Sequence, residues 1–146
     1  MRPTYNEGSR KVRVTLWIVQ GMLAALFLFA GGMKLVAPIE ELTKQGPVLP
    51  ELFIRFIGVL EVAGALGLIL PGLLRIRPQL TPLAAAGLMF VMTGATGATL
   101  AGGAGAGALV PVVVGLLLAG VGYGRWRVAP IAESQRHRVP ALRHAA

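Results

Sequence analysis

Long runs of uncharged, mostly apolar residues alternate along this chain with short clusters of charged residues. From Val14 to Met33 no side chain is charged, and about 20 helical residues are enough to cross the roughly 30 Å hydrocarbon core of a bilayer. The run therefore predicts a first membrane-spanning helix. A cleaved signal peptide is the alternative, since basic residues precede the run, but the apolar stretch is too long and the residues around Gly32 make a poor cleavage site.

The next apolar stretch, residues 50–70, predicts a second spanning helix. Pro50 suits the first helical turn, because its ring fixes φ at a helical value and its missing N–H would have no partner there. Glu51 then lies at the positive end of the helix dipole. The Pro71-Gly72 dipeptide is expected to end or kink this helix.

The longest uncharged stretch, residues 78–124, predicts two helices rather than one. A single helix of that length would measure about 70 Å, more than twice the bilayer core. The glycine-rich segment 101–107 is the predicted reversal, because each glycine weakens a helix interior by about 1 kcal/mol relative to alanine. We therefore expect a third helix at 81–100, with Thr81 as its N-cap, and a fourth at 109–128.

The basic residues cluster on one predicted side of the membrane. The opposite loops carry Lys44 together with Glu40 and Glu41, or no charge. The positive-inside rule therefore predicts that both termini are cytoplasmic (N-in/C-in), and the net charge of +8 indicates contact with anionic lipid headgroups on that face. The basic residues assigned to it are Arg2, Arg10, Lys11, Arg13, Arg75, Arg77, Arg125, Arg127, Arg136, Arg138 and Arg143.

Composition supports the same class. The chain is 55% hydrophobic and only 14% charged, whereas soluble domains are about 45–50% apolar and about 25% charged. The basic residues do not form one continuous stripe, which argues against a nucleic-acid partner. We predict an all-α, polytopic membrane protein: a basic N-terminal segment at 1–13, a four-transmembrane-helix bundle at 14–128, and a basic tail at 129–146. The first ten or so residues and the tail are expected to be disordered.

Few side chains within the predicted spans can carry chemistry. Glu61 lies near the middle of the second helix, where a carboxylate costs a few kcal/mol or more. We therefore predict an intramembrane polar site in which buried Glu61 is hydrogen-bonded or water-bridged to Lys34, with Arg55 one turn into the same helix. The alternatives are that Glu61 only holds helices together, and that Lys34 and Arg55 extend to the headgroups. Arg125 is expected to extend to the interface in that way.

Small residues at helical spacing predict close packing of helices within the bundle, because they let two backbones approach. A dedicated interface for a homo-oligomer is the less favoured use of the same pattern. The predicted packing positions are Gly58, Gly64, Gly94, Ala98, Gly120 and Gly124.

Several kinds of site are excluded by what the chain lacks. It has no cysteine, and its two histidines, His137 and His144, fall in the tail rather than in a span. No haem ligand, carboxylate cluster or activated nucleophile is available in the spans. We therefore expect no intrinsic cofactor, no metal and no catalytic activity of its own.

Two segments resemble the DoxX and DoxX-like membrane proteins: FAGGMKL at 29–35 and FIGVLEVAGALGLILP at 56–71. The resemblance extends over roughly residues 14–128 and implies a four-helix bundle in which Lys34, Glu61 and Gly64 occupy the positions that matter in the family. Residues 97–107 are richer in glycine and alanine than in many relatives, which puts in doubt any site built there.

The resemblance also implies a function, since members of this family are linked to quinone-dependent redox complexes. We expect an accessory subunit of a redox- or quinone-linked complex in the bacterial cytoplasmic (inner) membrane, with quinone as the expected ligand. Two alternatives remain open: a transporter or channel for a small solute or proton that uses Glu61, and a purely structural membrane protein.

Overall fold

The computed structural model describes residues 5–44, 49–74 and 79–128, and the described residues form helices with no strand. This confirms the all-α class. Four helical segments are long and apolar enough to cross a membrane: 10–36, 51–74, 80–101 and 105–127. The elements are α1 (Tyr5–Val36), α2 (Ile39–Thr43), α3 (Glu51–Leu74), α4 (Leu80–Ala101), the 3-10 helix η1 (Gly105–Ala108), α5 (Leu109–Tyr123) and the π-helix η2 (Gly124–Val128).

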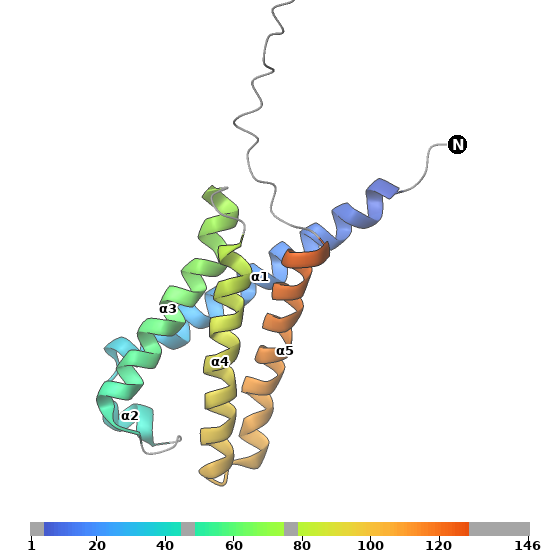
Figure 1. Ribbon diagram of the computed structural model, residues 1–146. Coiled ribbons are helices and arrows are strands. Elements are labelled where there is room, and N and C mark those ends of the chain that lie inside the picture. The colour runs from blue at the N-terminus through green and yellow to red at the C-terminus, as the bar shows by residue number, and fades with distance from the viewer. Residues whose placement is uncertain (1–4, 45–48, 75–78, 129–146) are drawn as a thin grey trace, which may run out of the picture.

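Each long helix packs mainly on its neighbours: α1 lies along α3, α3 along α4, and α4 along α5. Figure 1 shows α1 crossing behind the other three and meeting the end of α5 near η2. The beginning of α1 and the end of α5 lie at one end of the bundle, which we call the η2 end, and the short helix α2 lies at the other, the α2 end (Figure 1). That the η2 end faces the cytoplasm stays a prediction from the loop charges.

The centre of the bundle is apolar, and so is much of its surface. The core is made of residues from all four long helices: Leu23, Ala24, Phe27, Ala65, Leu68, Ala85, Leu88, Met92, Val114, Leu118 and Val121. Large apolar side chains also point outward on every long helix, for example Phe29, Phe90 and Leu116. A surface of this kind needs hydrocarbon around it, because a soluble protein rarely exposes large continuous apolar patches. The chain is a multi-pass membrane protein.

Glycines set how closely the helices approach one another. A Cβ added at Gly31 of α1 would lie 2.8 Å from the carbonyl oxygen of Gly58 on α3, and one added at Gly58 would lie 3.0 Å from the carbonyl oxygen of Gly31. The two backbones therefore touch at this crossing. On the other side of α3, added Cβ atoms at Gly64 and Gly67 would meet α4 at 2.6 and 2.8 Å.

The packing positions predicted from spacing are partly wrong. Gly58, Gly64 and Gly124 do lie against a neighbouring helix. A Cβ at Gly94 or Gly120 would meet nothing within 4 Å, and both glycines are exposed. Spacing alone shows that two small residues share a face, but it does not show whether that face meets a helix or the lipid. Ala98 is partly buried and lines a cavity rather than a helix contact.

Helix α1 begins before the predicted boundary. It starts at Tyr5 rather than near Val14, so part of the segment expected to be disordered is helical. A helix does not have to stop where the hydrocarbon ends, and no proline follows until residue 38. The tail 129–146, with its two histidines, lies outside the described residues.

Helix α3 continues through Pro71 to Leu74, beyond the predicted end at residue 70. The carbonyl that Pro71 deprives of its usual donor is that of Gly67, four residues earlier. The side-chain amide of Gln20 on α1 donates to the next carbonyl oxygen, that of Leu68, and ties α1 to α3 beside the proline. Pro71 itself lies buried inside the continuous helix.

Helix α4 begins at Leu80 with Gln79 at the cap position, so Thr81 is not the N-cap. The Thr81 hydroxyl is buried and has no hydrogen-bond partner among the residues that the structure describes. The short helix α2, Ile39–Thr43, was not predicted, because five residues are too few to give a periodic pattern.

The predicted reversal between the last two spans is confirmed. Helix α4 ends at Ala101, Gly102 caps it, and Gly103 adopts φ 79° before η1 leads into α5. Among the described glycines only Gly103 has a positive φ. An L-residue with a side chain is disfavoured in that region because its Cβ crowds the following carbonyl.

We expect Gly103→Ala to lower the free energy of unfolding by about 1 kcal/mol, measured by denaturant titration in detergent micelles. The added methyl group meets nothing within 4 Å, so the effect comes from the backbone alone. Gly105→Ala is the matched control: it also lies in open space, in the same turn, without a positive φ. Equal effects of the two substitutions would contradict this account of the turn.

Candidate functional site

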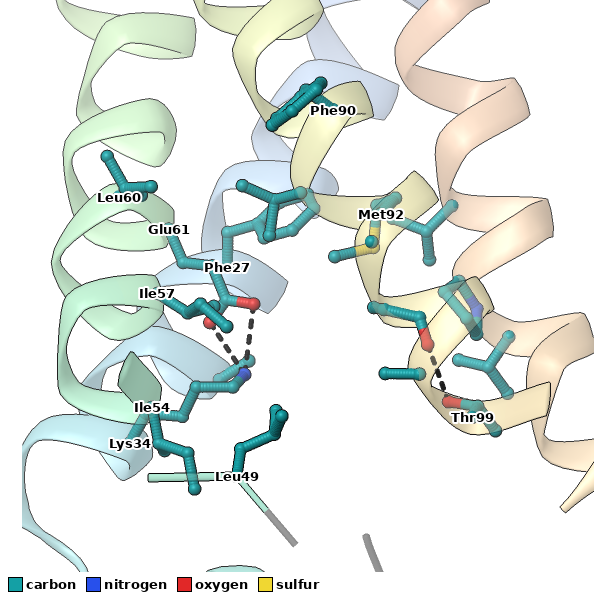
Figure 2. Close-up of a pocket in the computed structure, with 18 of the residues that line it drawn as sticks. Phe27, Lys34, Leu49, Ile54, Ile57, Leu60, Glu61, Phe90, Met92 and Thr99 are labelled. Carbon is teal, nitrogen blue, oxygen red and sulfur yellow. Dashed lines mark hydrogen bonds and ion pairs between the residues drawn. The ribbon is translucent and has the colours of Figure 1, made fainter. Parts of the chain in front are cut away.

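The predicted partners Lys34 and Glu61 meet where α1 crosses α3. The Nζ atom of Lys34 donates to both carboxylate oxygens of Glu61, at 2.8 and 3.0 Å. The Glu61 side chain is only 3% exposed and that of Lys34 is 28% exposed. Figure 2 shows the lysine extending from its helix toward the carboxylate rather than away from the bundle.

The crossing glycines explain why these two side chains meet. Gly31 and Gly58 touch at the closest point of the two helices. Each lies three residues before one member of the ion pair, and residues three apart lie on the same face of a helix. Because α1 and α3 run in opposite directions (Figure 1), Lys34 lies against Gly58 and Glu61 lies against Gly31, each with its Cβ 3.0 Å from a Cβ added at the facing glycine. The close approach lets the long lysine side chain extend along the crossing to the carboxylate, where the short ion pair forms.

Arg55 is close to this pair but has a different role. Its Nη1 atom donates to the carbonyl oxygens of Lys34 and Ala37, at 2.7 and 3.0 Å. On its other side Arg55 pairs with Glu51, at 3.1 Å. Arg55 thus extends toward the α2 end of the bundle, where it binds carbonyl groups at the end of α1 that have no donor within the helix, and thereby ties α1 to α3. That it also contacts lipid headgroups stays a prediction.

A cavity of about 650 Å³ lies beside the ion pair. Helices α3 and α4 are in close contact at Gly64 and Gly67 and diverge toward the α2 end (Figure 1). The cavity fills the resulting wedge, with α1 behind it and α5 at one side (Figure 2). Its lining includes Phe27 of α1, Ile57 and Leu60 of α3, and Phe90 and Met92 of α4.

Among the described residues that line the cavity, only Lys34, Glu61 and Thr99 have polar side chains. The Thr99 hydroxyl donates to the carbonyl oxygen of Ala95 at 2.8 Å and is thereby satisfied. The charges of Lys34 and Glu61 cancel, so this ion pair gives the cavity no net charge. An ammonium group has three N–H donors and a carboxylate has about four acceptor positions, so the pair can still donate to one ligand oxygen and accept from another.

Within residues 5–44, 49–74 and 79–128 there is no group of three histidine, cysteine, aspartate or glutamate residues that could hold a metal ion. The described lining of the cavity offers hydrogen bonds at Lys34 and Glu61 and apolar contact elsewhere.

A second polar cluster, at the η2 end, was missed in the sequence. The guanidinium of Arg125 is buried, not extended to the interface as expected, with the residue 3% exposed. Its Nε atom donates to Oε1 of Gln20 at 2.9 Å, and its Cζ lies 4.9 Å from the ring centre of Trp17. Gln20 is the sequence feature that could have indicated this cluster, because it is an uncharged polar residue inside the first apolar run.

Comparison with known proteins supports the resemblance seen in the sequence. The family model described as the DoxX-like family matches residues 18–121. No curated protein and no solved structure gives a match. The matched range includes α3, α4, most of α1 and α5, and both members of the Lys34–Glu61 pair. Because the match extends over more than half of the sequence, this chain belongs to the DoxX-like family.

Proposed function

We propose that the cavity beside Lys34 and Glu61 binds a small amphipathic molecule of the membrane, of the quinone class. On this proposal the chain is an accessory subunit of a redox- or quinone-linked complex in the bacterial cytoplasmic membrane, without a redox centre of its own. The observation that carries the proposal is a largely apolar cavity of about 650 Å³ in which the charged groups among the described lining residues are those of one ion pair.

The size and lining of the cavity support a ligand of this class. Small-molecule sites are typically about 300–1,000 Å³, mostly apolar, with a few placed polar groups that orient the ligand. A quinone has the complementary form, since it combines a ring bearing carbonyl oxygens with an apolar tail. The aromatic and aliphatic side chains of α3 and α4 suit the ring and the tail.

The charge balance of the site supports a neutral head group. A cationic ligand would be repelled by Lys34 and an anionic one by Glu61, and each would have to compete with an ion pair that is already formed at 2.8 Å. A quinone carbonyl can instead accept a hydrogen bond from the third N–H of the ammonium group, and a quinol hydroxyl can donate one to the carboxylate. One site can thus hold both the oxidised and the reduced form of the molecule.

The proposal is tested by loading the purified protein in lipid nanodiscs with a short-chain quinone and measuring binding by native mass spectrometry. Gly94 lines the cavity and has open space around it. We expect Gly94→Phe to weaken quinone binding by about tenfold or more, because the ring would occupy part of the cavity without disturbing a helix contact.

Gly97→Phe is the matched control. Gly97 lies on the same helix, is also exposed with nothing within 4 Å, and is not among the described residues that line the cavity. Retained binding in this variant together with loss in Gly94→Phe supports the proposal. No binding to the unaltered protein, or equal losses in the two variants, would overturn it. Proton flux through the protein in liposomes that disappears with Glu61→Gln would favour the transport alternative.

A further inference from the structure

Arg125 carries a buried charge for which the described residues supply no paired carboxylate. Its Nε atom donates to Gln20, while its Nη2 atom is buried and has no hydrogen-bond partner in the described part of the chain. The Nη2 side of the guanidinium is therefore left without an acceptor among these residues. An unpaired buried charge is costly unless a partner neutralises it.

A second positive charge lies nearby. Arg13 lies one turn before Trp17 on α1, so that Arg13, Trp17 and Gln20 share one helix face, and Trp17 and Gln20 on that face contact Arg125. Where side chains are described, no ion pair joins either arginine to a carboxylate. The described glutamate side chains lie elsewhere, in α2 and α3: Glu40, Glu41, Glu51 and Glu61.

The position of the guanidinium is fixed by its neighbours. Gln20 is fully buried and is itself anchored, because its amide donates to the Leu68 carbonyl while its oxygen accepts from Arg125. The ring of Trp17 lies against the guanidinium, and Gly124 lets α1 approach so closely that an added Cβ would lie 2.7 Å from the Leu16 side chain. An arginine fixed in this way presents a planar fork that matches a phosphate group.

The depth of the cluster indicates which anions can reach it. Tyr123 and Trp126, on either side of Arg125 in the sequence, are exposed, and such aromatic residues mark the level of the lipid headgroups. The abundant anions at that level are phosphate groups.

We propose that Arg125, oriented by Gln20 and Trp17, forms with Arg13 a site at the η2 end that binds one phosphate group. The group belongs either to a membrane phospholipid or to a soluble phosphate compound. The site is separate from the cavity of the proposed function, so each can fail without the other.

The test uses the full chain purified in a neutral detergent and stripped of lipid. In one arm phosphatidylglycerol is added and counted by native mass spectrometry; in the other, inorganic phosphate is added and its effect on the melting temperature is measured. Binding of phosphatidylglycerol but not of inorganic phosphate assigns the site to a lipid, and the reverse assigns it to a soluble compound. Neither ligand binding would overturn the proposal.

Variants decide whether Arg125 is responsible. We expect Arg125→Gln to weaken binding of whichever of the two ligands binds the unaltered chain by about tenfold or more. This is the equivalent of one hydrogen bond to a charged group. Arg127→Gln removes the same charge two residues away, from an exposed side chain, and is expected to change binding by less than about twofold. Equal losses would indicate attraction by surface charge alone and would overturn the proposal.

Should Arg125→Gln fail to fold, Arg125→Lys keeps the test decisive. It preserves the charge and loses the planar fork, so we expect a several-fold weakening of binding. If Arg125→Lys binds phosphatidylglycerol and phosphate as tightly as the unaltered chain does, the site is not built on the guanidinium and the proposal is contradicted.

Discussion

Replacing Gly31 with alanine is expected to lower the free energy of unfolding by about 2 kcal/mol, which is typical of adding a methyl group where there is no room for it. The new Cβ would lie 2.8 Å from the carbonyl oxygen of Gly58 and 2.9 Å from the side chain of Val62. The carbonyl belongs to the backbone of α3 and cannot rotate away, so the two helices must separate. The measurement is reversible unfolding in mixed micelles.

The neighbouring glycine provides the control. Gly32→Ala adds the same methyl group to the same helix, where nothing lies within 4 Å. Alanine favours a helix by about 1 kcal/mol over glycine, so this variant is expected to be as stable as the unaltered chain or more so. If Gly31→Ala and Gly32→Ala behave alike, α1 and α3 do not cross at Gly31.

The second large effect is expected at the ion pair. Lys34→Met leaves the Glu61 carboxylate buried without its partner, and breaking a buried pair from one side costs about 3–5 kcal/mol. Because Lys34 is partly exposed, we expect about 3 kcal/mol, at the lower end of that range. The double variant Lys34→Met with Glu61→Leu removes both charges, and we expect it to recover most of the loss.

An exposed pair in the same chain gives the comparison. Lys44 and Glu41 form an ion pair whose side chains are each 61% exposed, and Glu41→Ala is expected to cost less than about 1 kcal/mol. A single Lys34 variant as mild as Glu41→Ala, or a double variant no more stable than the single one, would show that Lys34 and Glu61 are not coupled as described.

Much of the architecture follows from the apolar runs. Length and hydropathy predict the number of spans, because crossing hydrocarbon requires about 20 helical residues. The reversal near Gly103 follows from a run too long to be one span. The pairing of Lys34 with Glu61 could also be predicted, since a buried carboxylate needs a donor and few were available.

Features that depend on which helix face meets which neighbour could not be predicted. Gly58 and Gly94 look alike in sequence, yet one touches the backbone of α1 and the other is open. Arg125 follows an apolar run, as an arginine at the membrane surface would, and only the approach of α1 places Gln20 and Trp17 beside it. These contacts arise from the crossing of distant helices, and no local pattern records that crossing.

The cavity wall has one property that bears on how it would fill. Phe56, Leu60 and Phe90 line the cavity and are also exposed, so the cavity is open where α3 and α4 diverge rather than enclosed. A molecule dissolved in the bilayer can enter sideways without passing through water. The occupancy of the cavity then follows the mole fraction of that molecule in the surrounding lipid. A dissociation constant expressed per volume of buffer would therefore change with the ratio of lipid to protein.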